Sequence, residues 1–160
     1  MRWELRFSHR VTSLLIFPRS SRGGGGTALI YRYAFNVSKI DAGEKVSFEL
    51  SEWKVVIPSS HDLRIIIVYR PPYSGNHKVP SSTFFNEFSE YLESDVLCSE
   101  QLIAVGDFNF HIDVQNDNDA VTLLNTLESF GLEQYVAAPT HTVGHTLDLI
   151  ISRSSDKLYN

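Results

Sequence analysis

Apolar and polar residues in the first half of the chain alternate with the period of β-strands. A β-rich run at 27–33 follows four glycines, and the segment 45–57 alternates apolar with polar residues from Val46 to Leu50, as a half-buried strand does. The continuous apolar run at 63–70 is typical of a strand covered on both faces, and the prolines from Pro71 end it. These patterns predict three strands.

In the second half the hydrophobic period changes to that of helices. A first helix is predicted after Ser81 or Ser82, either of which can serve as its N-cap. Its apolar face consists of Phe84, Phe88, Tyr91 or Leu92, and Val96. A second helix is predicted from Asp117 or Asn118 to Gly131, which ends it. Its apolar face consists of Ala120, Leu123, Leu124, Leu127 and Phe130.

Two further strands are predicted around the second helix, at 101–107 and 146–152. Strands that are followed by alternating helices and strands indicate a layered α/β fold in which helices cover a sheet. The length of 160 residues, with 42% hydrophobic and 21% charged residues, fits one globular domain and excludes a disordered chain. No apolar run approaches the about 18 residues of a membrane span, so we expect no membrane partner.

The net charge of −5 hides an asymmetry between the two halves of the chain. Residues 1–80 carry 12 Lys and Arg against 6 Asp and Glu, whereas residues 81–160 carry 2 against 13. Either a basic surface for a polyanion lies beside an acidic region, or two acidic helices simply come late in the chain. Cys98 is the only cysteine, which excludes an internal disulfide and favours a reducing compartment.

Two groups of residues suggest chemistry but are weak signals by themselves. The run Gly23–Gly26 lacks the Gly-Lys-Ser/Thr of a phosphate-binding loop and precedes a strand instead of a helix. The residue types at His111, Asp113, His141 and His145 are those of zinc ligands. However, no His-Glu-x-x-His is present, and hydrogen-bonding loop histidines are the simpler interpretation.

A stronger constellation lies at the ends of strands. Asp107 and Asn109 leave one predicted strand, Tyr69 ends another, and Asp148 lies inside a third. Gly106 permits a close backbone approach or an unusual dihedral angle where the chain turns. An aspartate there can act as a base for water, an amide can hold an oxyanion, and a tyrosine can donate to a developing negative charge. A buried Asp148 would need a partner, for which histidine is suited.

Four segments of the chain occur in an order that is informative. They are PRSSRGGGGTALIYR (18–32), LRIIIVYRPP (63–72), LIAVGDFNFHID (102–113) and LESFGLEQYVAAPTHTVGHTLDLIISR (127–153). Together they resemble the endonuclease/exonuclease/phosphatase superfamily, and most closely the endonuclease domain of LINE-type non-LTR retrotransposons. The resemblance implies a four-layer α/β sandwich, truncated at both ends, and hydrolysis of DNA phosphodiesters with Mg²⁺, or with Mn²⁺ in its place.

The resemblance also implies a role for each motif residue. Asp107 would bind the metal and would orient and deprotonate the attacking water. Asn109 would contact the scissile phosphate, and Tyr69 would stabilise charge near it. Asp148 would orient a catalytic histidine, and Arg70 would bind the substrate.

The chain departs from the family pattern at two places. The strand-end Asn and Glu that the family carries ahead of the glycine run, and the Ser-Asp-His that follows the last strand, are not found. We therefore expect residues 1–13 to be unmatched and residues 14–160 to form a partial domain with weak or no activity. Two alternatives are a non-catalytic remnant that binds nucleic acid or protein and a phosphoesterase for small substrates. An intracellular, nuclear location is implied by the resemblance alone.

Overall fold

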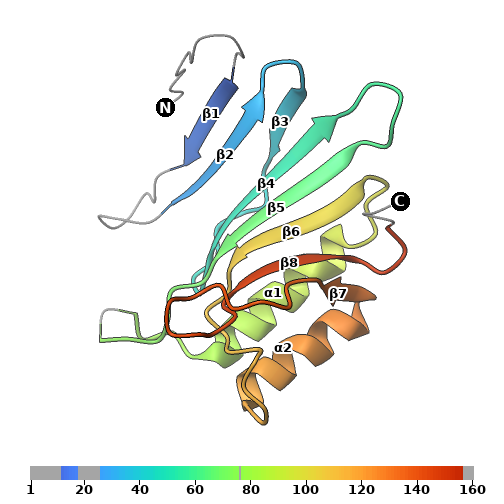
Figure 1. The fold of residues 1–160 in the computed structure, drawn as a ribbon. Helices are drawn as coiled ribbons and strands as arrows, with labels where there is room; N and C mark the ends of the chain where they lie inside the picture. Colours follow the sequence, from blue (N-terminus) through green and yellow to red (C-terminus); the bar gives the residue numbers. More distant parts are fainter. Residues whose placement is uncertain (1–11, 18–25, 76, 157–160) are drawn as a thin grey trace.

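Two β-sheets and two helices make up the described part of the chain, which comprises residues 12–17, 26–75 and 77–156 of the computed structural model (Figure 1). The strands are β1 (Thr12–Phe17), β2 (Thr27–Arg32), β3 (Asn36–Ile40), β4 (Glu49–Val56), β5 (Leu63–Tyr69), β6 (Gln101–Asp107), β7 (Leu132–Gln134) and β8 (Asp148–Arg153). The helices are α1 (Ser81–Asp95) and α2 (Asn118–Ser129).

The larger sheet has the strand order β3-β4-β5-β6-β8-β7. Its strands are antiparallel except for β5 and β6, which run parallel and are joined through α1. The predicted strand at 101–107 matches β6. By contrast, β4 begins only at Glu49, and Val46 is 69% exposed. The predicted strand is therefore too long at its amino end, where the backbone N–H groups of Val46 and Ser47 donate to the Glu87 carboxylate of α1.

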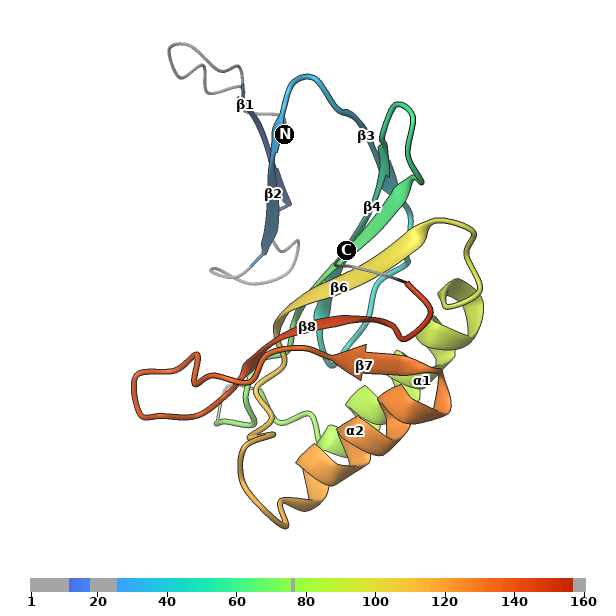
Figure 2. The same ribbon diagram turned by 45° about the vertical axis from the view of Figure 1, so that its right-hand side comes forward.

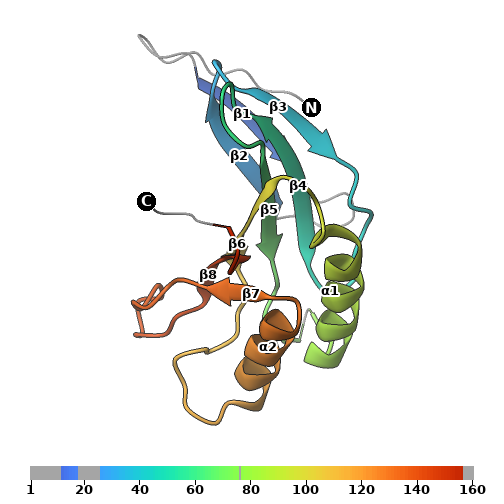
Figure 3. The same cartoon turned by 90° about the vertical axis from the view of Figure 1, so that its right-hand side faces the viewer.

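Both helices lie on one face of this sheet (Figure 3). The core between the helices and the sheet is rich in aromatic rings, because α1 directs Phe84 and Phe88 onto the strands. Fully buried strand residues from the same core are Ile66, Val68, Leu102, Ala104, Leu149 and Ile151. Burial of a side chain of this size contributes about 1.5–3 kcal/mol. The predicted apolar face of the first helix is confirmed, since all its members are buried.

The smaller sheet consists of β1 and β2 and lies on the opposite face of the larger one (Figure 2). Trp53 is only 1% exposed on this face. Beside it the Thr27 hydroxyl donates to Ser51 Oγ at 2.7 Å, which joins β2 to β4. The expected layered α/β sandwich is confirmed. In the described residues its layers are the helices, the six-stranded sheet and the two-stranded sheet.

The starts of the two helices differ from each other in how they are capped. Asp117 caps α2, as predicted, because its carboxylate accepts from the backbone N–H groups of Asp119 and Ala120. The N-cap of α1 is Pro80, so the prediction of a serine cap is wrong. The Ser81 hydroxyl instead donates to Asp119 Oδ1 at 3.0 Å. The Ser81 side chain therefore connects the two helices instead of capping α1.

Three strands were not predicted from the sequence. β3 and β7 are short edge strands of five and three residues, and few of their residues are buried enough to impose a pattern. β1 pairs with β2 from Thr12 to Phe17. Because it begins at Thr12, the predicted domain boundary between residues 13 and 14 falls inside this strand, and the boundary itself stays a prediction.

Candidate functional site

Four polar side chains form one row across the larger sheet. Tyr69 on β5 lies opposite Asp107 on β6, and Asp107 lies opposite Asp148 on β8. On the other side of Tyr69, the row continues to Glu49 at the start of β4. Residues that are directly opposite on neighbouring strands share a face of the sheet. The register therefore brings together three of the sequence-predicted residues and adds Glu49, on the face away from the helices.

Gly106 is required for the close approach of β5 and β6 beside this row. Its φ angle is +143°, and a Cβ at this position would lie 1.8 Å from the Val68 carbonyl oxygen. No other residue type can fit in such a space without moving the backbone. The expectation of a close approach at Gly106 is confirmed, and it places Asp107 at the end of a tightly paired strand.

The Asp107 carboxylate is a more basic group than an ordinary aspartate. Burial raises its pKa, and the charge of Asp148 raises the pKa further. The hydrogen bond from the Asn109 backbone N–H to Asp107 Oδ1, at 3.1 Å, and the charge of His141 act in the opposite direction. The net result is a raised pKa, which favours proton uptake from a bound water.

Asn109 stands at a strained position of the turn that follows β6. Its φ angle is +51°, in the left-handed region that few residues other than glycine adopt. Its side-chain amide donates to the Arg70 carbonyl oxygen at 2.8 Å, while its backbone N–H donates to Asp107 Oδ1. The amide thus connects the ends of β5 and β6. Its predicted contact with a phosphate stays a prediction.

Asp148 is placed differently from the prediction, since it is the first residue of β8 and is exposed. It does not lie inside the strand, because the Thr140 hydroxyl oxygen accepts from the backbone N–H groups of both Leu147 and Asp148 at 3.0 Å. Strand β8 therefore begins at Asp148, whereas the predicted strand begins at residue 146. An exposed Asp148 does not need the buried histidine partner that the sequence suggested.

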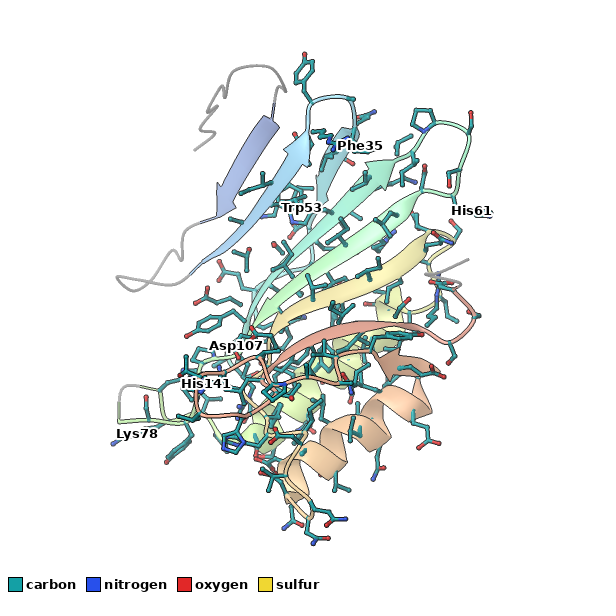
Figure 4. All side chains as sticks on the ribbon, in the orientation of Figure 1. Phe35, Trp53, His61, Lys78, Asp107 and His141 are labelled. Carbon is teal, nitrogen blue, oxygen red and sulfur yellow. The ribbon has the colours of Figure 1, made fainter. Side chains whose placement is uncertain are left out.

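The loop histidines divide into two groups. His145 Nδ1 lies 3.0 Å from Asp113 Oδ2, and the His111 ring stands edge-on to His145. The hydrogen bonds from the Thr146 backbone N–H and from His145 lower the pKa of Asp113 to about 2. The His141 backbone N–H donates to the His145 carbonyl oxygen at 2.9 Å, but the His141 ring accepts from Val143 and lies at the same end of the sheet as Asp107 (Figure 4). In the part of the chain that the structure describes, no three His, Cys, Asp or Glu side chains are arranged to hold a metal ion.

Arg70, the predicted substrate-binding residue, is only 6% exposed. Its guanidinium donates to the carbonyl oxygens of Phe108 and Asn109, and burial lowers its pKa. This side chain therefore contacts groups of the protein itself. Its role in binding substrate stays a prediction.

Sequence reasoning missed two polar residues of this site. Glu49 joins the row only through the pairing of β4 with β5, and its Oε2 accepts from the Gly26 backbone N–H at 2.5 Å. The charge of His141 acts on Asp107 from the loop that the Thr140 hydroxyl joins to the start of β8. Neither placement has a signal in the local sequence, which indicates only that histidine is a residue type suited to chemistry.

The carboxylates of Asp107 and Asp148 suit a divalent cation such as Mg²⁺. Both supply hard oxygen ligands, and their mutual repulsion, which helps to raise the pKa of Asp107, would be relieved by a cation between them. Mg²⁺ is commonly held by one or two carboxylates, with water and substrate phosphate as further ligands. The residues present therefore fit the ion, provided that water and substrate complete its coordination.

Three solved structures are similar to this chain over most of its length. D. rerio TDP2 humanized by 14 mutations has 14% identity and a TM-score of 0.56, with 93% of this chain and 63% of that one covered. An endonuclease/exonuclease/phosphatase family protein from Leptotrichia buccalis has 12% identity, a TM-score of 0.52, and coverages of 91% and 61%. The human Nocturnin catalytic domain with bound sulfate has 14% identity, a TM-score of 0.53, and coverages of 89% and 60%.

These similarities show the fold, which is that of endonuclease/exonuclease/phosphatase proteins. The chain spans less than two thirds of the length of each of the three structures. No family model matches the sequence, and no curated protein matches it. Among the described residues, neither helix has the length and apolar character needed to cross a membrane.

Proposed function

We propose that this chain carries a metal-dependent phosphodiesterase site of the retrotransposon endonuclease type, with DNA as its substrate and the nucleus as its place of action. One observation carries the proposal. Tyr69, Asp107 and Asp148 come from three strands and lie side by side in one row, directly before the turn that holds Asn109. The fold, which is that of nuclease and phosphatase proteins, supports it.

The motif residues take the roles that the family resemblance implies, and the surroundings of Asp107 agree with its role. Asp107, whose pKa is raised by burial and by Asp148, accepts a proton from the attacking water. The Tyr69 hydroxyl donates to a phosphate oxygen on which negative charge develops. The Asn109 backbone N–H donates to Asp107 Oδ1, and the Asn109 side-chain amide, which now donates to the Arg70 carbonyl oxygen, would contact the same phosphate. Positioned donors and bases of this kind supply most of the rate in such sites.

Asp107 and Asp148 are the residues that would hold Mg²⁺. When bound, the ion would neutralise phosphate charge and polarise the P–O bond. The charge of His141, in the loop before β8, also acts on Asp107 at this end of the sheet.

We further propose that the 160 residues by themselves hydrolyse DNA weakly or not at all, because they hold only part of the set that the family uses. The test is incubation of the chain with supercoiled plasmid and Mg²⁺ or Mn²⁺, beside the Asp107→Ala variant. Little nicking is expected from either protein. Nicking at the rate of an intact nuclease, lost in the variant, would show that the site is sufficient as it stands. Phosphate release from a small phosphomonoester would favour the phosphoesterase alternative.

A second candidate function is nucleic-acid binding without cleavage. The excess of basic residues in the first half of the sequence favours it. Binding to a DNA duplex in EDTA should then weaken steeply with salt, because phosphate contacts release counterions. The exposed residues Arg32 and Lys39 test this directly, since their replacement by glutamine should reduce the salt dependence. Affinity that does not change with salt would contradict this function.

A further inference from the structure

Arg70 is a buried cation that forms no ion pair among the described residues, although the charges of Asp119 and Asp107 act on it from a greater distance. It directly follows Tyr69 at the end of β5 and is 6% exposed. Burial lowers the pKa of its guanidinium. A buried charge is costly unless other groups replace its hydration. The groups that contact Arg70 should therefore show why the chain retains an arginine at this position.

Those groups belong almost entirely to the turn after β6. The Arg70 backbone N–H donates to the Asp107 carbonyl oxygen at 2.8 Å, and the Arg70 carbonyl oxygen accepts from Asn109 Nδ2 at 2.8 Å. Arg70 Nη1 donates to the carbonyl oxygens of Asn109 at 3.2 Å and Phe108 at 3.4 Å. Main chain and side chain of one residue thus contact three successive residues of the turn.

Aromatic rings hold the guanidinium in this position from the other side. Its central carbon lies 4.0 Å from the centre of the Phe110 ring and 5.7 Å from that of Phe84. The two rings also contact each other, with centres 5.3 Å apart. A planar guanidinium can stack on a ring and donate to carbonyls within its own plane, whereas the ammonium of a lysine cannot do both.

The turn needs such support because its backbone is unusual. Asn109 has a φ angle of +51°, in the left-handed region that asparagine enters more readily than most residues with a Cβ but that still needs support from its surroundings. Without the hydrogen bonds from the guanidinium to the carbonyl oxygens of Phe108 and Asn109, the backbone of the turn would be free to leave this conformation. The Asn109 backbone N–H would then no longer be held at Asp107 Oδ1.

We infer that Arg70 is a positioning residue of the site, which acts by fixing the 107–110 turn and not by touching the substrate. It holds the Asp107 carboxylate and the Asn109 amide in the arrangement that the reaction requires. This inference rests on the proposed phosphodiesterase function. Arg70 would then not contact the phosphate itself, as the sequence suggests, but would position Asp107 and Asn109.

The test uses Arg70→Lys and Arg70→Met, with Leu102→Ala as the matched control. Leu102 is fully buried at the opposite end of β6, so its truncation destabilises the fold without touching the turn. The milder Ile66→Val replaces it if that control does not fold. Two properties are measured by NMR without any substrate. They are the affinity for Mn²⁺, from paramagnetic broadening of the amide signals of Asp107 and Asn109, and hydrogen exchange of the Asn109 side-chain amide.

Both Arg70 variants should bind Mn²⁺ at least about tenfold more weakly than the wild type, as when groups that orient metal ligands are lost. Exchange of the Asn109 amide should become faster in both variants. The control should lose thermal stability but keep both properties. If Arg70→Lys keeps the exchange rate or the Mn²⁺ affinity of the wild type, the inference is wrong. If the wild type itself shows no Mn²⁺ broadening at Asp107, the proposed function fails instead.

Discussion

Gly106 and Val68 face each other so closely that a Cβ on Gly106 would lie 1.8 Å from the Val68 carbonyl oxygen. The contact lies directly before Asp107 and opposite the position that precedes Tyr69. A single missing side chain therefore allows the two strands that carry the site to pair up to their ends.

Replacement of Gly106 by alanine should be among the most damaging changes in this chain. The new methyl group would push β5 and β6 apart, and the φ angle of +143° is unfavourable for any residue with a Cβ. We expect a loss of more than about 3 kcal/mol in the free energy of unfolding, measured by urea titration. Gly75→Ala is the control, because a Cβ at Gly75 has nothing within 4 Å. A loss no greater than that of the control would contradict the close approach.

Divalent metal ions should stabilise the wild-type chain through Asp107 and Asp148. Any ion that binds only the folded state raises the melting temperature, so Mn²⁺ should raise it in the wild type and not in Asp107→Asn or Asp148→Asn. The double variant should show no further loss of the response to Mn²⁺ than either single variant, because both carboxylates would hold the same ion. Glu93→Gln, on the exposed side of α1, should behave as the wild type. An equal response of all these proteins would argue against a metal site in this row.

Glu100 should make the stability of the chain depend on acid. Burial alone would raise its pKa, but the contacts with Lys54 at 3.0 Å and Arg64 at 3.2 Å outweigh burial and lower the pKa to about 2. A carboxyl group whose pKa is lowered in the folded state stabilises the fold at any pH above its ordinary pKa of 4.5. This stabilisation is lost as the pH falls from 4.5 towards 2.

The Glu100→Gln variant should therefore be less stable than the wild type at pH 6, and the difference should shrink as the pH is lowered towards 3. Urea unfolding at several pH values measures it. Glu90→Gln, on the exposed side of α1, serves as the comparison. A difference between wild type and Glu100→Gln that stays constant over this range would show that the ion pairs do not hold the proton off Glu100.

The N-cap of α2 offers a smaller and cleaner test. Asp117 accepts from the backbone N–H groups of Asp119 and Ala120 at 2.9 and 3.0 Å. Asp117→Ala should cost about 1 kcal/mol in the free energy of unfolding. Asp117→Asn retains the accepting oxygen, so most of this loss should be recovered. Equal losses in the two variants would mean that the charge of Asp117, and not its cap, stabilises the chain.

The amino-acid sequence by itself determined most of the local structure. Apolar, β-rich runs located β2, β5 and β6, and helical periods located both helices, because these elements bury regular sets of side chains. The combination of glycine, aspartate and asparagine after β6 marked the turn of the site, because these residue types tolerate backbone angles that others avoid. Edge strands such as β3 escaped detection, since they bury little.

Only the tertiary structure decided how these elements combine into a site. The row of Tyr69, Asp107 and Asp148 depends on the register between strands that are far apart in the sequence, and a shift of one residue would turn each side chain to the other face. Burial of Arg70 likewise depends on Phe84 and Phe110, which arrive from other segments. Periodicity indicates which face of an element is buried, whereas the packing of the whole fold determines which distant elements contact each other.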